Sequence, residues 1–360
     1  MAKLLSYPSQ PSCGTNARVA LLSALMVIGS LGVTGQATAQ EGGDFFKGKQ
    51  ISVMIGYGPG GGYDVYSRFM ARHYGNHVPG NPAVVAQNRP GAGSIRLANE
   101  LYNALPADGT VIGMIADVLP IKKVVGEPGL LFDPNGFHWI GRLTVTDPIL
   151  VIRSDAPALT IEDARQKEVT IGIPGAGSAT GQTIAVVNYL LGTKFKLISG
   201  YPSGTEVRLA LERGEVDGSG SVMWGISKDW IARSNLKMLY QTTLEKYPGL
   251  PDVPRLIDLG RTDDERRLLR FFGSYVEVGR SFIAPPKVPA ERVAILRAAF
   301  IKMTQDPAFL AEAEKAKLDL NVLSGEQMQS AIAEVTGLSG ELLKKAVAIN
   351  QATAVKEGND

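Results

Sequence analysis

The feature that most constrains the fold is an order of elements that occurs twice along the chain. In each unit a short apolar strand leads into a loop of glycine and other small residues, which is followed by a helix and a second strand. The two strand and loop pairs are 51–55 with 56–62, and 169–173 with 174–178. Strands that alternate with helices predict parallel pairing in an α/β fold. We therefore expect two α/β lobes with one unit in each.

Helical patterns account for the other long apolar stretches. Proline at the start and an apolar position every three or four residues predict helices in the last quarter of the chain. The expected helices are those from about 63 to 75, over 95–105 and 180–191, from Pro289 to about 305, from Pro307 to about 317, and over 341–350. Further strands are expected near 83–86, 110–115 and 194–198.

The first glycine-rich loop has the outline of a phosphate-binding turn. Gly56, Gly58 and Gly61 have the dinucleotide spacing, and such glycines let backbone amides approach an anion at a helix N-terminus. A nicotinamide site also needs an acidic residue at the end of the next strand, where this chain has Gln87-Asn88. What remains is either a general anion-binding loop or only a tight turn. Two such loops facing each other could hold a small carboxylate by backbone amides, without a buried arginine.

Groups for nucleophilic or metal chemistry are scarce. The only cysteine is Cys13, and the histidines are His73, His77 and His138. No Gly-x-Ser-x-Gly turn follows a strand. His73 and His77 have a metal-pair spacing, but Gly75 interrupts their helix. We therefore expect no catalytic residue, no metal and no cofactor.

One acidic residue after the first loop has two interpretations. Asp64 lies four residues before Arg68, so the two could form a surface ion pair that complements the helix N-terminus. Alternatively, Asp64 could point into a cleft and orient water or a ligand. The spacing alone does not decide between them.

The first 39 residues have the form of a secretory signal peptide. Lys3 and Arg18 precede an apolar run over 19–33, and small residues end at Ala39 in an A-x-A pattern. The alternative is a retained anchor, although the run is short for a membrane span. Cleavage after Ala39 would leave a chain without cysteine and with equal numbers of acidic and basic residues. Such a chain is typical of a bacterial periplasm, and its charge does not favour nucleic-acid binding.

Six segments, in order, carry a family resemblance. Residues 51–64, with Arg68, resemble the opening signature of the substrate-binding receptors of tripartite tricarboxylate transporters, the Bug receptors. The other similar segments are 88–93, 106–110, 214–217, 250–254 and 284–289. The resemblance extends over about residues 48–330.

The resemblance implies a type II-like periplasmic binding protein of the α/β class with two lobes. Each lobe would be a mixed, mostly parallel sheet flanked by helices. The first lobe would comprise 44–146 and 281–360, and the second 147–280. The hinge crossings would lie near 146–148 and 279–283.

The resemblance also implies a function. A monomeric periplasmic receptor would capture a small carboxylate-containing metabolite between the lobes and deliver it to the membrane subunits of a tripartite tricarboxylate transporter. The implied ligand-binding residues are Tyr57, Pro59, Gly60, Gly61, Gly62, Asp64, Gly175, Ala176, Gly177, Ser178 and Tyr201. The alternative is an exported nucleotide-using or hydrolytic α/β enzyme built on the same loops.

Overall fold

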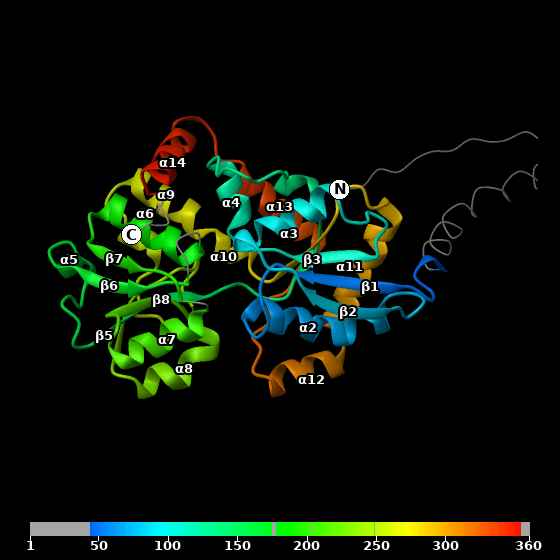
Figure 1. Cartoon of the computed structure of the whole chain (residues 1–360), viewed down its shortest axis with the longest axis horizontal. Coiled ribbons are helices and arrows are strands. Elements are labelled where there is room, and N and C mark those ends of the chain that lie inside the picture. The colour runs from blue at the N-terminus through cyan, green and yellow to red at the C-terminus, as the bar shows by residue number, and fades with distance from the viewer. Residues whose placement is uncertain (1–43, 175–177, 202, 248, 354–360) are drawn as a thin grey trace, which may run out of the picture. The chain divides into compact units, whose positions relative to one another are not determined.

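The structure, a computed structural model, describes residues 44–174, 178–201, 203–247 and 249–353. The proposed signal peptide therefore lies outside the described residues. Helices surround two separate β-sheets in the described part (Figure 1). None of the helices described here is both long and apolar enough to cross a membrane.

The first sheet has six strands in the order β11-β4-β10-β3-β1-β2. β1 is parallel to β2 and β3, whereas β10 is antiparallel to β3 and β4. The strands are β1 (Gln50–Ile55), β2 (Ala83–Asn88), β3 (Val111–Met114), β4 (His138–Arg142), β10 (Ser281–Ala284) and β11 (Leu323–Ser324).

The strand β1, next to the edge strand β2, is largely buried because helices cover both faces of this sheet. Val53 packs in one apolar cluster with Phe69 of α2 (Gly62–Tyr74) and Phe300 of α11 (Ala290–Thr304). The next residue, Met54, belongs to another cluster together with side chains of α3 (Ile95–Asn103) and α13 (Gly325–Thr336). Successive side chains of a strand point to opposite faces, so β1 supplies both clusters.

The second sheet has five strands in the order β7-β6-β8-β5-β9. β6 is parallel to β7 and β8, and β5 is antiparallel to β8 and β9. The strands are β5 (Pro148–Arg153), β6 (Val169–Gly172), β7 (Phe195–Ile198), β8 (Gly218–Met223) and β9 (Leu236–Gln241). The α/β class and the mixed sheets are as expected. The parallel strands, however, form only one side of each sheet.

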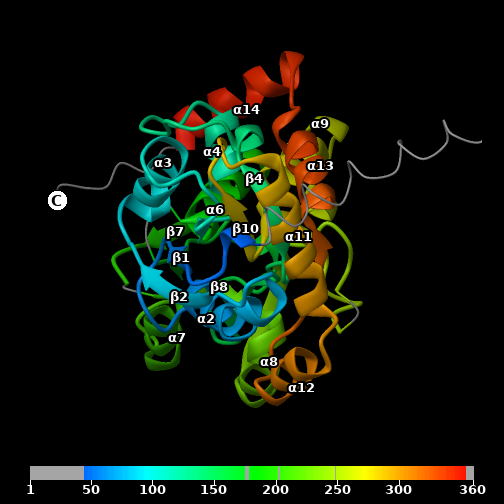
Figure 2. The ribbon, with the colours of Figure 1, turned by 90° about the vertical axis from the view of Figure 1, so that its right-hand side faces the viewer.

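The other helices connect and cover the sheets (Figures 1 and 2). They are α4 (Leu119–Val124), α5 (Ile161–Ala164), α6 (Ala179–Leu191), α7 (Gly204–Arg213), α8 (Trp224–Arg233), α9 (Asp263–Gly273), α10 (Tyr275–Val278), α12 (Pro307–Lys315) and α14 (Gly340–Thr353). α14 packs on α6 and α9, and α6 also contacts β7 and β8. The last helix thus contacts elements around the second sheet, although the predicted first lobe includes it.

Two chain segments connect the sheets and lie side by side. Residues 143–147 lead from β4 to β5, and 279–280 lead from α10 back to β10. The backbone amide of Arg280 donates to the carbonyl of Thr144 at 2.9 Å. Gly279 has a φ of +51°, and a Cβ there would lie 2.2 Å from that same carbonyl oxygen. The lobe boundaries and the hinge at these segments stay predictions.

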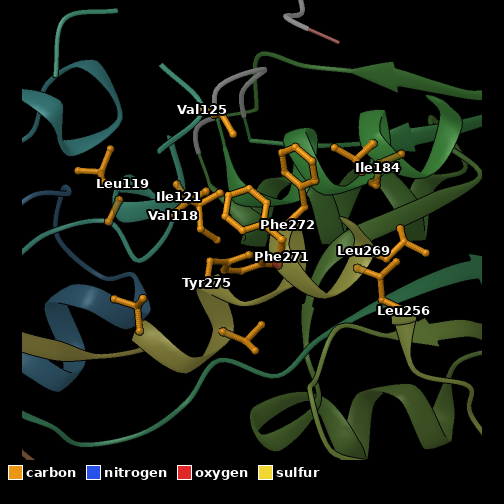
Figure 3. Packing of buried hydrophobic residues seen from close by; sticks show 14 of the residues in the cluster. Val118, Leu119, Ile121, Val125, Ile184, Leu256, Leu269, Phe271, Phe272 and Tyr275 are labelled. Carbon is orange, nitrogen blue, oxygen red and sulfur yellow. The ribbon is translucent and has the colours of Figure 1, made fainter. Parts of the chain in front are cut away.

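One apolar cluster extends from α4, which follows β3 of the first sheet, to α6, α9 and α10. Figure 3 shows Val118, Ile121 and Val125 from the region of α4 in the same group as Ile184 of α6 and the aromatic residues of α9 and α10. Phe272 and Tyr275 are at most 3% exposed. Burial of such side chains contributes about 2 kcal/mol each. Because α9 and α10 belong to this cluster, it fixes the position of the chain just before Arg280.

Candidate functional site

Asp64 organises the first glycine-rich loop. Its carboxylate accepts hydrogen bonds from the amide of Gly60 at 3.0 Å, Nε of Arg68 at 2.8 Å and Nδ2 of Asn88 at 2.8 Å. Asn88 also donates to the carbonyl of Tyr57 at 2.9 Å. Burial raises the pKa of Asp64, but the hydrogen bonds outweigh burial, and the pKa is lowered overall. The ion pair with Arg68 forms, and its carboxylate is buried rather than on the surface.

The loop presents the N-terminus of α2. Pro59, Gly60, Gly61 and Gly62 are exposed, and the N-cap residue Gly61 makes no side-chain hydrogen bond to the first turn. The first amides of a helix have no partner within the helix. They carry a positive partial charge of about half an elementary charge. The end of this helix can therefore donate hydrogen bonds to an anion.

A buried arginine lies beside this helix end. The guanidinium of Arg280 lies 4.0 Å from the ring centre of Tyr63, and Tyr63 stacks on Tyr57 with ring centres 4.4 Å apart. Nη1 of Arg280 is 3.3 Å from Oδ2 of Asp117. Arg280 is 7% exposed and Asp117 5%. Burial raises the pKa of Asp117, which the nearby guanidinium opposes only in part.

A cleft of about 540 Å³ begins at these residues. Gly62, Tyr66 and Arg280 line it, together with the connecting residues 144–147. Its other lining residues come from three segments, which are the loop after α12, the end of β8 with the start of α8, and the loop after β9. They include Met223, Trp224, Gly225, Lys228, Tyr247, Gly249, Asp319, Leu320 and Asn321.

Two carboxylates face the N-terminus of α8 in the cleft. Asp147 accepts a hydrogen bond from the amide of Gly225 at 2.6 Å. Oδ2 of Asp319 is also close to Gly225. A Cβ added to this glycine would lie 1.9 Å from that oxygen. Burial raises the pKa of Asp147 to about 6, and the Asp319 carboxylate adds to the increase.

The second predicted loop lies at the second sheet. Gly175, Ala176 and Gly177 lie outside the described residues. Ser178 is the N-cap of α6, where its hydroxyl accepts a hydrogen bond from the amide of Gly181 at 3.1 Å. Tyr201 is half-buried, and its ring packs against an apolar cluster of the second sheet that includes Leu211.

The predicted site residues therefore fall into two groups. Tyr57 and Gly60 are joined to Asp64 in one network at the end of β1, whereas Ser178 and Tyr201 follow β6 and β7. Of the described predicted residues, Gly62 lines the cleft. Parallel strands place their carboxyl ends at one edge of a sheet, which is where ligands bind in α/β folds.

Sequence reasoning missed Arg280 and Asp117. The sequence signal for Arg280 was a charged residue just before the apolar residues 282–284, at a predicted crossing. A charge next to a buried strand needs a partner. Asp117 follows β3, and it comes close to the loop after β1 only because β3 and β1 pair.

The two spaced histidines pair with carboxylates. Nε2 of His73 lies 2.7 Å from Glu312, and Nε2 of His77 lies 3.1 Å from Asp306. Over the described ranges, no group of three or more potential metal-ligating side chains comes together.

The two mixed sheets, the paired connecting segments and the cleft define a two-lobed periplasmic binding protein fold. Solved structures share it. The periplasmic binding protein BugD matches with a TM-score of 0.63 at 18% identity, covering 86% of this chain and 99% of BugD. MatC from Rhodopseudomonas palustris, solved with bound malate, matches with a TM-score of 0.62 at 18% identity, covering 84% and 99%.

The sequence comparisons name the family. The sequence model of the tripartite tricarboxylate transporter family receptor matches residues 75–347. The UPF0065 protein in the gbd 5′ region of Cupriavidus necator is 23% identical over 337 residues, covering 91% of this chain and 96% of that protein. The chain belongs to the tripartite tricarboxylate transporter receptor family. Members of this family are periplasmic substrate-binding receptors, which confirms the receptor interpretation over the enzyme alternative.

Proposed function

We propose that this receptor captures a small carboxylate-containing metabolite in the cleft and delivers it to the membrane subunits of a tripartite tricarboxylate transporter. It acts as a monomer in the periplasm after removal of its signal peptide behind Ala39. The cleft binds the ligand between the two lobes, and closure about the connecting segments encloses it.

The observation that carries the proposal is the N-terminus of α2. The Asp64 network holds the loop from Tyr57 to Gly62 in place, so the amides of the first turn face the cleft without a competing side-chain cap. A carboxylate is a small planar anion that two adjacent amides can bind together. The malate in MatC, a relative in fold, is a ligand of this chemistry.

The remaining predicted residues complete the site in this proposal. Gly175, Ala176, Gly177 and Ser178 contact the ligand from the second lobe, and Tyr201 closes one side. Ser178 and Tyr201 both follow parallel strands of the second sheet, which supports this assignment.

Ligand-dependent stabilisation tests the proposal. The protein is purified from the periplasm, freed of bound ligand by unfolding and refolding, and heated with acetate, succinate, malate or citrate. A ligand at one hundred times its Kd stabilises a protein by about 2.7 kcal/mol, so binding raises the melting temperature in a saturable way. NAD and a simple ester serve as probes of the enzyme alternative. Stabilisation by these and by none of the carboxylates would overturn the proposal.

A further inference from the structure

Arg280 is held rigidly in the wall of the cleft. Tyr63 lies against its face, Asp117 contacts Nη1, and its backbone bonds to the neighbouring connecting segment at Thr144 and Leu143. A guanidinium positioned this way loses little conformational entropy when it binds a ligand.

The other edge of the guanidinium faces the helix end. In the described part of the chain, Nε and Nη2 have no hydrogen-bond acceptor, although Arg280 is only 7% exposed. This edge points at the first turn of α2, because a Cβ on Gly62 would lie 3.4 Å from Nη2 and 3.5 Å from Nε. Arg280 also lines the cleft. Gly62 itself therefore lies in front of this edge, and Arg280 places its positive charge beside the helix N-terminus, where both residues line the cleft.

The charges in this arrangement favour an anion. A cation beside a helix N-terminus is unfavourable because both are positive. The raised pKa of Asp117 shows that burial disfavours its charged form, so it compensates Arg280 incompletely. An anion in the cleft beside Arg280 and the amides of α2 would be attracted by both, in a partly buried site where such interactions are strong.

We propose that Arg280 and the first-turn amides of α2 form an anion subsite that binds one carboxylate group of the ligand in the cleft beside the helix N-terminus. The inference rests on the proposed function and deepens it. The sequence-based expectation was a carboxylate held by backbone amides alone, whereas here a salt bridge contributes. The ligand's remaining part extends along the cleft toward Asp147 and Asp319, so uncharged or hydrogen-bond-donating groups fit that end better than a second carboxylate.

Substitution of Arg280 tests the subsite by calorimetric titration with lactate, a monocarboxylate that carries a hydroxyl donor, and with malate for comparison. Arg280→Gln should weaken binding by about 100-fold, because it removes a buried charge from a charge-assisted pair. Arg280→Lys keeps the charge but not the planar guanidinium that Tyr63 holds in place, and it should weaken binding by about 10-fold. Arg292→Gln is the matched control, since the Arg292 guanidinium also lies over an aromatic ring, Phe45 at 3.6 Å, but does not line the cleft. It should leave the affinity unchanged.

A double variant distinguishes weak binding from a failure to fold. If Arg280→Gln fails to fold because Asp117 is left buried without its partner, the double variant Arg280→Gln, Asp117→Asn removes both charges and should fold but bind weakly. Wild-type affinity in any folded variant without Arg280 would overturn the inference and leave the proposed function standing.

Phosphate and sulfate separate the two proposals. If the wild type binds one of these and no carboxylate, and Arg280→Gln abolishes that binding, the anion subsite stands and the proposed ligand class is wrong. A wild type that binds none of these anions contradicts both.

Discussion

The raised pKa of Asp147 predicts a pH-dependent cost to stability. The Asp147 carboxyl is shielded in the cleft beside Asp319, and its pKa rises from 3.8 to about 6. Each unit of pKa difference corresponds to about 1.4 kcal/mol, so the charged form costs up to about 3 kcal/mol relative to the unfolded chain. Because the folded state binds this proton more tightly, the cost is absent below pH 4, grows between pH 4 and 6, and is complete above pH 6.

The variant Asp147→Asn should remove this cost. Asparagine keeps an oxygen that can accept the hydrogen bond from the amide of Gly225, but it carries no charge. The variant should therefore be more stable than the wild type by up to about 3 kcal/mol at pH 7.5 and equally stable near pH 4. Urea unfolding of both proteins at several pH values measures this difference.

A neighbouring variant provides the control. Asp319→Asn should show a smaller gain in the same pH range, because the Asp319 charge is a secondary cause of the raised pKa. A stability difference between Asp147→Asn and the wild type that does not change from pH 4 to 7.5 would refute the reasoning.

Three further substitutions probe the loop and the connecting segment. Asp64→Asn should destabilise the protein by about 3 kcal/mol at pH 7 through loss of charge-assisted hydrogen bonds. The loss should begin to shrink as the pH falls below about 4, where the unfolded carboxyl takes up a proton, and it should disappear only once the folded carboxylate, whose pKa is lowered, is protonated too. Equal loss in urea unfolding at about pH 2.5 and at pH 7 would contradict this. Gly61→Val should leave the melting temperature unchanged, since its φ is −86° and no atom lies within 4 Å of the added Cβ, but should weaken malate binding by at least about tenfold by covering the helix N-terminus; unchanged affinity would remove this loop from the site. Gly279→Ala should cost more than about 2 kcal/mol in urea unfolding, because its Cβ would meet the Thr144 carbonyl at 2.2 Å and its φ is positive; a neutral effect would show that this segment can shift.

The parts of the fold that sequence could predict are those with local signals. The strand at 51–55 and the helix after it follow from apolar residues, glycines and spacing within about 25 residues. The parallel pairing of β1 with β2 and β3 follows from that alternation. The helix expected to start at Pro289 begins one residue later, with Pro289 as its N-cap.

The antiparallel half of each sheet depends on distant parts of the chain. β10 inserts between β3 and β4 only after the chain has built the second sheet. Short apolar strands give no information about such partners. The helix α9, by contrast, has a local signal for its start, since Thr262 and Glu265 form a capping box there.

The candidate site likewise contains residues that local sequence predicts and residues that only the fold brings together. Asp64 and the glycine-rich loop were found because their spacing lies within one strand–loop–helix unit. Arg280 was not found, because more than 200 residues separate it from Gly62 and only the return of the chain at β10 brings them together. The positive charge that Arg280 brings to the cleft therefore depends on how the strands are connected, and no short segment of the sequence reveals it.

A crystal structure of the protein with a bound carboxylate, identified by mass spectrometry of the released ligand, tests the central claim most directly. We expect one carboxylate group beside the guanidinium of Arg280 and within hydrogen-bond distance of the amides of Gly62 or Tyr63. A ligand bound elsewhere, with no group beside Arg280, would contradict this expectation.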